Sequence, residues 1–404
     1  MTIVDHPPVA ELTGYQLIQL GEVTSRAASV DPKKKFLDAF TYIDLSSVDQ
    51  AQKKVSDTKN LEPSEAPSRA RQVVQTSDVL VSTVRPNLNG VAVVPKVLDG
   101  SIASTGFTVL RPDASKILPT YLFQWVKSPR FIDDMISKAT GASYPAVSDK
   151  IVRESTIPLP PLPEQRRIAA ILDKADHLRT QRREALAHLD ALTQSMFNSM
   201  FGNLDPEKTG WPILPIGEVC DAIVDCVNRT APLADAPTPY KMIRTSNVRN
   251  RSIDLTSVRY VDEHTFVTWN RRAVPSHGDV VLTREAPMGE AGIIPPGEQV
   301  FLGQRTMLYR PDPDISTAEF LLHYLTGEHM HREYLRNGSG TTVKHLSVPY
   351  CRTLDVAVPP LELQQSFARR VAGVERLKEQ HRTQLAQLDT LFASLQHRAF
   401  SGQL

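Results

Sequence analysis

Two long stretches of the chain carry apolar residues at the three-and-four spacing of a helix face. In each stretch these residues repeat over four to five heptads, which is typical of a coiled-coil seam. A helix start is predicted at Pro163 and Glu164, and Gly202 and Gly402 are suitable stops. The predicted seam residues are Ile168, Ile171, Ala175, Leu178, Leu189 and Leu192 in the first stretch and Phe367, Val374, Leu377, Leu388, Leu391 and Leu395 in the second.

Each stripe is too narrow to be the core of a globular domain, so each needs a partner helix. Packing one against the other buries both, and an antiparallel arrangement would give the chain a pseudo-twofold axis. A helix of about 35 residues is about 50 Å long. One turn of DNA is roughly 34 Å long, so such a helix is long enough to hold two domains about one turn apart on a duplex. Arg182 and His381 interrupt the two seams at the same heptad position. They either extend along the seam edge to solvent or fix the register by polar pairing.

The sequence before each long helix mixes strand-like and helical patterns. The runs 79–84 and 280–283 are rich in β-branched residues and read as strands. The segments 119–138 and 317–336 carry apolar residues at helical spacing, and each predicts one amphipathic helix. The expected fold class is therefore α+β, with mixed α/β domains separated by paired helices.

The second half of the chain repeats the first at an offset near 199 residues. For example, Leu110-Arg111-Pro112-Asp113 recurs as Tyr309-Arg310-Pro311-Asp312, and Leu189-Asp190-Ala191-Leu192 recurs as Leu388-Asp389-Thr390-Leu391. The order of such matches is kept along the chain, which indicates an internal duplication. We expect a first globular domain at 1–158, a long helix at 159–204, a second globular domain at 205–357 and a second long helix at 358–404; a function for the domains as recognition modules and for the helices as spacers depends on the resemblance described below.

Composition and charge narrow the function classes. Of 404 residues 41% are hydrophobic and the formal net charge is +1, so the chain does not coat nucleic acid with a uniformly basic face. Residues 205–358 contain 16 Lys and Arg against 19 Asp and Glu, so any DNA face of that domain is a local patch. Three unpaired cysteines, an N-terminus without a signal pattern and no apolar run of membrane-spanning length favour a cytoplasmic protein.

No catalytic or metal-binding motif is recognised. The chain lacks a phosphate-binding glycine loop ending in Gly-Lys-Ser/Thr, and it lacks the glycine-rich loop and polar-Pro-Pro-aromatic site of a methyltransferase. His323, His329 and His331 lie near one predicted helix, but the last two are two positions apart and face different sides. We therefore predict no catalytic residue, no metal site and no cofactor bound by this chain.

The segment Pro158-Leu159-Pro160-Pro161-Leu162-Pro163-Glu164-Gln165-Arg166-Arg167-Ile168-Ala169 resembles a conserved region of type I restriction-modification specificity subunits. The C-terminal Ala399–Leu404 and the segments 278–284 and 338–347 are similar to parts of the same family. The second copy departs from the helix-start signature, with Leu363 where the first has Glu164. The resemblance implies that each domain reads one part of a gapped double-stranded DNA site. It also implies two methyltransferase partners that use S-adenosylmethionine, two further ATP-dependent translocase-nuclease subunits where restriction occurs, and no membrane.

Base reading needs forked donors or paired donor and acceptor groups, and phosphate contact needs basic or small polar groups. The candidates in the first domain are Arg85, Asn87, Ser143 and Tyr144. Those in the second are Arg244, Asn247, Arg249, Arg251, Arg284, Arg305, Lys344 and His345. For each of them a solvated surface residue is the alternative.

Two other function classes stay open at this point. The duplicated domains could bind proteins and never DNA, as in an adaptor, or the chain could hold an enzyme site of unrecognised type. Selection of a gapped DNA sequence with strong salt dependence favours the DNA reader, whereas activity of the purified chain with S-adenosylmethionine or ATP favours the enzyme.

Overall fold

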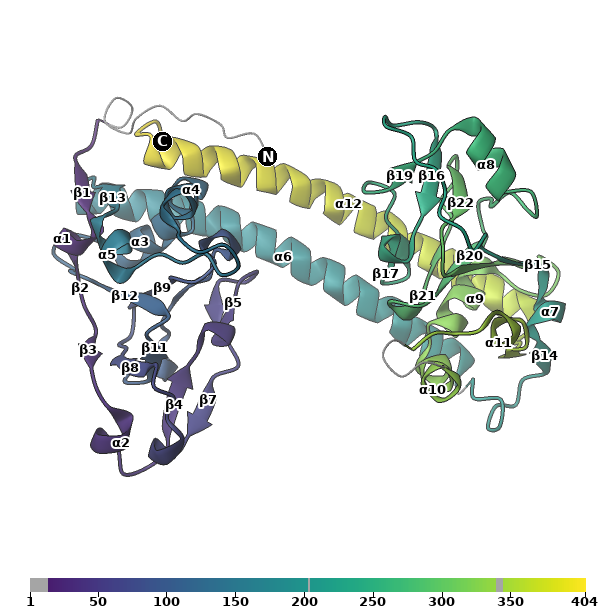
Figure 1. Ribbon diagram of the computed structural model, residues 1–404, viewed down its shortest axis with the longest axis horizontal. Helices are drawn as coiled ribbons and strands as arrows, with labels where there is room; N and C mark the ends of the chain where they lie inside the picture. The colour runs from purple at the N-terminus through teal and green to yellow at the C-terminus, as the bar shows by residue number, and fades with distance from the viewer. Residues whose placement is uncertain (1–13, 203, 339–343) are drawn as a thin grey trace. The chain divides into compact units, whose positions relative to one another are not determined.

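The computed structural model describes residues 14–202, 204–338 and 344–404 (Figure 1). They form two compact units, one made of the chain up to Arg183 together with Gln384–Leu404, and the other of Glu184–Thr383. Each unit therefore combines one predicted recognition domain with parts of both predicted spacer helices. Within the described residues no helix is both long and apolar enough to cross a membrane.

The first unit contains two main sheets. The antiparallel four-stranded sheet has the order β10 (Val91–Val93), β9 (Val79–Ser82), β12 (Phe107–Pro112), β2 (Thr24–Ser25). The five-stranded sheet has the order β3 (Ala28–Ser29), β8 (Ala70–Val73), β11 (Ile102–Ser104), β4 (Phe40–Ile43), β7 (Lys59–Leu61), and its β11–β4 pair is parallel. Two short antiparallel pairs complete it: β1 (Leu17–Gln19) with β13 (Thr156–Pro158), and β5 (Val48–Asp49) with β6 (Lys54–Val55).

The second unit repeats this plan. Its antiparallel sheet has the order β15 (Cys220–Asp225), β23 (Thr306–Pro311), β20 (Val280–Arg284), β21 (Met288–Ile293). A smaller sheet, β19 (Arg259–Tyr260), β16 (Tyr240–Ile243), β22 (Gln299–Leu302), again holds one parallel pair, β16–β22. The short pairs are β14 (Ile213–Pro215) with β24 (Asp355–Ala357), and β17 (Val248–Arg249) with β18 (Ser252–Ile253). The strands predicted at 79–84 and 280–283 are confirmed as β9 and β20.

The two segments predicted as single amphipathic helices are each broken in the middle. Residues 119–138 form α3 (Pro119–Val126) and α4 (Pro129–Lys138), and residues 317–336 correspond to α9 (Ala318–Leu325) and α10 (Glu328–Asn337). The prediction of one helix was wrong because Ser128 caps α4, accepting a hydrogen bond from the Phe131 amide, and Pro129 lacks the N–H that a continuous helix needs. Apart from the two long helices, the other described α-helices are α1 (Leu20–Val23), α2 (Pro32–Lys35), α5 (Asp149–Glu154), α7 (Ile216–Val219), α8 (Glu263–Trp269) and α11 (Val348–Arg352).

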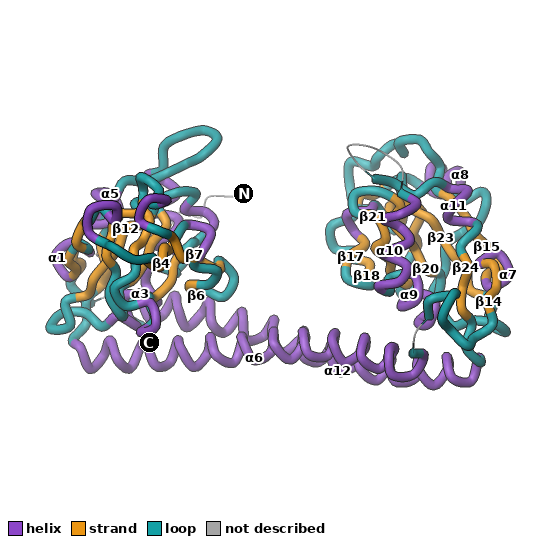
Figure 2. Tube along the Cα trace, turned by 90° about the horizontal axis from the view of Figure 1, so that it is seen from below, coloured by secondary structure: helices purple, strands orange, loops and turns teal. Residues whose placement is uncertain are grey.

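The two predicted spacer helices are α6 (Leu162–Phe201) and α12 (Leu361–Phe400), each of 40 residues, and they lie side by side (Figure 2). They run antiparallel, as the ion pairs Arg179–Asp389 and Lys378–Asp190 require. In the first unit Arg179 Nε lies 2.6 Å from Asp389 Oδ1, and Arg167 donates to the Leu404 carbonyl oxygen. In the second unit Lys378 Nζ lies 2.7 Å from Asp190 Oδ1. The pairs Arg179–Asp389 and Asp190–Lys378 are equivalent under the 199-residue offset. The duplication therefore extends to the contacts between the helices.

The long helices complete the hydrophobic cores of the domains. Leu172 of α6 and Phe400 of α12 lie in the core of the first unit, where the Phe400 ring contacts Trp125 with centroids 4.9 Å apart. Val371 and Phe201 take the corresponding place in the core of the second unit. The apolar stripe of each long helix is wider than a coiled-coil seam, because it packs both on a domain core and on the other long helix.

This arrangement corrects the predicted seam at four positions. Leu178, Leu192, Leu377 and Leu391 keep 38%, 46%, 48% and 49% of their surface exposed. A seam that buries all twelve predicted residues is therefore wrong for these leucines. The other eight predicted seam residues are buried or partly buried, and Ile168 and Phe367 among them belong to the domain cores.

A buried glutamine fixes the start of each long helix to its domain. Gln165 accepts from the Leu118 amide and donates to the carbonyl oxygens of Lys116 and Pro160. Gln364 makes the equivalent three bonds, to the Thr317 amide and to the carbonyl oxygens of Ile315 and Pro359. Both side chains are fully buried, so these bonds hold the direction in which each helix leaves its domain.

Candidate nucleic-acid interface

The four candidates of the first domain lie on two adjacent loops. Arg85 and Asn87 follow strand β9, and Ser143 and Tyr144 lie between α4 and α5; all four are exposed. Backbone contacts join the loops: the Arg85 amide donates to the Pro145 carbonyl oxygen at 2.7 Å, and Val84 and Ala146 form a β-bridge. The fold therefore brings together residues that are about 60 positions apart in the sequence.

The side chains of Arg85 and Tyr144 contact each other across this loop pair. The Arg85 guanidinium carbon lies 4.5 Å from the centroid of the Tyr144 ring, which is a cation–π arrangement. Tyr144 is 68% exposed. Within the described part of the chain, the Arg85 guanidinium has no hydrogen bond or ion pair, so its N–H donors face solvent.

The backbone at Arg85 is held in an unusual conformation. Its φ and ψ are 50° and 62°, in the left-handed region, and the next residue is Pro86. A side chain other than glycine costs roughly 1–3 kcal/mol there, and such strain persists where the surrounding structure fixes it. Asn89, at the far end of the same loop, is also left-handed with φ 50°.

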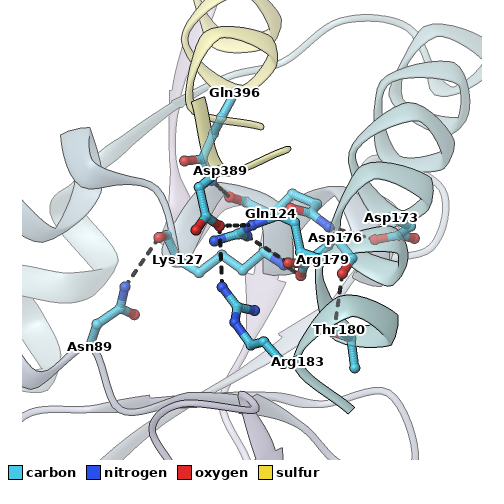
Figure 3. A network of polar contacts seen from close by, with 10 residues as sticks. All are labelled: Asn89, Gln124, Lys127, Asp173, Asp176, Arg179, Thr180, Arg183, Asp389 and Gln396. Atoms are coloured by element: carbon cyan, nitrogen blue, oxygen red, sulfur yellow. Dashed lines mark hydrogen bonds and ion pairs between the residues drawn. The ribbon is translucent and has the colours of Figure 1, made fainter. Parts of the chain in front are cut away.

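A polar network ties this loop to the helix pair (Figure 3). The Asn89 side chain donates to the Lys127 carbonyl oxygen at 3.2 Å, and Lys127 Nζ lies 2.7 Å from Asp176 of α6. Arg179 bridges Asp176 and Asp389 of α12, with its guanidinium carbon 4.3 Å from the centroid of the Phe392 ring. The loop that carries Arg85 is thus braced against both long helices.

The electrostatics of this network have clear physical causes. Burial raises the pKa of Asp176, but Lys127 and Arg179 more than offset it, and the pKa of this carboxyl falls below its ordinary value. Lys53 donates to the Asn89 carbonyl oxygen at 2.6 Å. Burial, with a contribution from the positive charge of Lys127, lowers the pKa of Lys53 to about 8.

The first group of candidates in the second domain is committed to bonds within the protein. Asn247 is buried; its amide oxygen accepts from the Arg244 amide and its nitrogen donates to the Ser257 carbonyl oxygen. Arg249 donates to the carbonyl oxygens of Thr245 and Val248, and Arg251 donates to the Thr326 hydroxyl at 2.7 Å. Asn247 therefore caps a turn, and its burial contradicts a base-reading role.

The second group surrounds the end of β20, and its key residue is also buried. Arg284 is 6% exposed and donates to the Leu346 carbonyl oxygen. The prediction that the Arg284 side chain contacts DNA is therefore corrected: Arg284 is the last residue of β20, and its side chain packs inside the domain. Arg305 pairs with Glu285 at 2.8 Å, Lys344 Nζ donates to the Leu335 carbonyl oxygen, and His345 forms a β-bridge with Glu285. The glycine-threonine segment 339–343 lies outside the described residues.

Hydrogen bonding identifies the true equivalent of Arg85 in the second domain. The Thr83 amide donates to the Gly106 carbonyl oxygen, and the Arg284 amide makes the matching bond to Arg305. Thr83 thus corresponds to Arg284, and Arg85 to Ala286, which has the same left-handed φ of 50° before a proline. The signal available in the sequence was the local offset of 201 residues between the strands β9 and β20. The two domains therefore place different side chains at this loop position.

A groove of about 1990 Å³ lies in the second unit, bounded by the β17–β18 hairpin, α9, α10 and both long helices. Its lining contains six Lys and Arg side chains and six Asp and Glu side chains. This balanced charge does not suit the phosphate backbone. His323 lines the groove, and burial lowers its pKa to about 3. The described residues contain no group of three or more His, Cys, Asp or Glu placed to hold a metal.

Comparison with known proteins identifies the family. The family model for the type I restriction modification DNA specificity domain matches residues 17–188 and again 208–389. The chain belongs to the family of type I restriction-modification specificity subunits. Its two matches coincide with the two copies of the internal repeat.

Curated relatives of this specificity subunit include the type I restriction enzyme MjaVIII specificity subunit of Methanocaldococcus jannaschii, 23% identical over 66% of this chain. Another is the type I restriction enzyme EcoBI specificity subunit of Escherichia coli, 22% identical over 68%. The matches span 66% and 64% of those relatives' lengths, slightly less than two thirds.

Solved structures with the same fold cover nearly the whole specificity subunit. A chain from a study of complex assembly and conformational transition of the type I R-M system is 27% identical, with a TM-score of 0.58, over 98% of this chain and 100% of that one. The S subunit of a type I system from M. genitalium is 12% identical, with a TM-score of 0.56, over 97% of each chain, and it supports the fold alone.

Proposed function

We propose that this specificity subunit reads a bipartite, gapped site on double-stranded DNA and holds methyltransferase subunits on it. Each recognition domain reads one half of the site, and α6 and α12 set the gap between the halves. A continuous 40-residue helix is about 60 Å long, which exceeds one turn of DNA, about 34 Å. The supporting observation is a duplication that keeps buried contacts such as those of Gln165 and Gln364 while changing the exposed loop residue, Arg85 in one domain and Ala286 in the other.

The docking of two methyltransferase subunits rests on the exposed leucines of the long helices. Leu178 and Leu391 lie in the first unit and Leu192 and Leu377 in the second, and both sets are equivalent under the 199-residue offset. Exposed leucines of the two long helices supply apolar surface that a partner protein can cover. Their equivalent positions in the two units suit two copies of one partner.

Chemistry in this proposal belongs to the partners. The specificity subunit itself is non-catalytic and binds no cofactor; the methyltransferase subunits carry S-adenosylmethionine. In a complex that also restricts DNA, two translocase-nuclease subunits carry ATP and magnesium. The proposed site of action is the cytoplasm, where the chromosomal DNA of the host is methylated.

The test is methylome sequencing of a host that expresses this chain with its methyltransferase, compared with the same host lacking this chain. The expected result is adenine methylation at one two-part sequence with a fixed gap, present only when the chain is expressed. Methylation that is independent of the chain, or that follows an ungapped sequence, would overturn the proposal. Binding of the methyltransferase without any selected DNA sequence would support a protein adaptor instead.

A further inference from the structure

The pair formed by Arg85 and Tyr144 carries an inference that rests on the proposed function and makes it more specific. We infer that the first recognition domain reads a G·C base pair in its half of the site through Arg85, with Tyr144 as the residue that positions the guanidinium. The ligand is the major-groove edge of guanine, which presents two acceptors, O6 and N7, side by side.

The first argument is the free donor set of Arg85. Within the described residues its guanidinium has no hydrogen-bond or ion-pair partner, whereas Arg249, Arg251, Arg284 and Arg305 each bind a group of the protein. An arginine fork satisfies two adjacent acceptors at once, and guanine is the base that offers such a pair. Among these predicted arginine candidates, Arg85 is the one that remains available.

The second argument is orientation. The guanidinium lies 4.5 Å from the centre of the Tyr144 ring, so the side chain is held against a surface instead of sampling its many rotamers. Tyr144 is 68% exposed, so the stack stands at the surface of the domain, where a duplex can reach it. Pre-ordering the donor fork lowers the entropy lost when it binds a base.

The third argument is the cost of the backbone at this position. Arg85 adopts the left-handed conformation with φ 50° before Pro86, and Ala286 keeps that φ in the second domain. The two domains therefore share this backbone φ at the start of the loop, while the residue displayed there differs and the chain continues differently: Pro86–Leu88 form a 3-10 turn, whereas strand β21 begins at Met288. One backbone position that displays different side chains suits two domains that read different half-sequences.

The Arg85 loop is also rigid enough for base reading. Its start is pinned by the bond from the Arg85 amide to Pro145, and its end by the bond from Asn89 to Lys127. Lys127 in turn is anchored to Asp176 of α6. A reader fixed to the helix pair keeps its place relative to the helices that set the gap.

The experiment uses the methyltransferase complex assembled with the full chain, and determines both half-sequences by methylome sequencing and by selection from random duplexes. The wild type is expected to show a G·C pair in the half read by the first domain. Arg85→Ala is expected to lose discrimination at that one position by roughly 5- to 150-fold, with the other half-sequence and the gap unchanged.

Companion variants separate the roles of charge, fork and stacking. Arg85→Lys keeps the charge but loses the fork, and discrimination at the same position should fall. Tyr144→Phe should retain it, because the ring remains, whereas Tyr144→Ala should weaken it at that position alone. Arg69→Ala, which removes an exposed arginine of the same domain, is the charge-matched control and should leave both half-sequences unchanged.

Three outcomes would overturn the inference while leaving a bipartite reader in place: no G·C pair in the first half-sequence, an unchanged half-sequence in Arg85→Ala, or a loss of affinity in Arg85→Ala that is equal for all sequences. The last result would indicate that Arg85 contacts a phosphate. In Arg85→Ala the slope of log affinity against log salt concentration would then fall in magnitude by about one. If the wild-type complex methylates no gapped sequence at all, the proposed function itself fails. Thermal unfolding of each variant verifies that the exposed substitutions leave the fold intact.

Discussion

The ion pair between Arg179 and Asp389 should contribute measurably to the pairing of the long helices. We expect a double-mutant cycle with Arg179→Gln and Asp389→Asn to give a coupling free energy of about 1 kcal/mol. Arg179 Nε lies 2.6 Å from the Asp389 carboxylate, and its side chain is 18% exposed, whereas Asp389 is 44% exposed. Exposed pairs contribute about 0.2–1 kcal/mol after solvent screening, and the partial burial of Arg179 against Phe392 places this pair at the upper end.

The equivalent pair in the second unit provides a matched comparison. Lys378 lies 2.7 Å from Asp190, and the side chain of Asp190 is 63% exposed. Because the carboxylate is more solvated than in the first unit, we expect the cycle of Lys378→Gln with Asp190→Asn to give a smaller coupling, about 0.5 kcal/mol. Combining Asp389→Asn with Lys378→Gln, eleven positions apart on α12, should give additive effects.

The assay is urea unfolding of the full chain, followed by circular dichroism, at about 0.05 M and about 0.5 M salt. The coupling between Arg179 and Asp389 should shrink at high salt, because charges with partial exposure are screened. A coupling below about 0.3 kcal/mol at low salt would refute the reasoning, since the contact would then contribute no more than additive errors. A coupling that is equal at both salt concentrations would show that packing on Phe392, and not charge, holds the pair.

Three further predictions follow from other parts of the structure. Gln165→Leu and Gln364→Leu each leave one backbone amide and two backbone carbonyl groups without a hydrogen-bond partner. Each variant should therefore destabilise its unit by a similar amount, about 3 kcal/mol. A thermal scan in which only one of the two variants lowers the Tm would contradict their equivalence. The pKa of Lys53 is lowered to about 8, because its charged form is disfavoured in the folded state. The free energy of unfolding should therefore rise as the pH rises from about 8 to the ordinary lysine pKa of about 10.5, over which Lys53 is neutral in the folded state and charged in the unfolded state. In Lys53→Met this rise should flatten in pH-dependent unfolding, while the exposed control Lys54→Met should keep it. Insertion of four residues at Ala185 and at the equivalent Gln384 adds about 6 Å to each long helix. This should lengthen the gap in the methylated sequence by about two base pairs. Altered half-sequences would disprove the proposal that the long helices set the gap.

The amino-acid sequence by itself determined the features that depend on periodic or repeated patterns. Apolar spacing is a local property, so it located two long helices close to their observed bounds, Leu162–Phe201 and Leu361–Phe400. Repetition at 199 residues revealed the duplication, because two copies of one fold keep similar residues at buried positions. The proline-rich start of the first long helix pointed to the specificity-subunit family.

Tertiary structure decided which side chains are buried and which remain available. Arg85 and Arg284 are both arginines at the end of a strand, yet one stacks on Tyr144 at the surface and the other lies inside its domain. That difference depends on where the strand ends and on a loop about 60 residues away, which no local pattern encodes. The stripe of each long helix likewise divides between a domain core and the partner helix, so spacing alone could not show that Leu178 and Leu391 stay half-exposed.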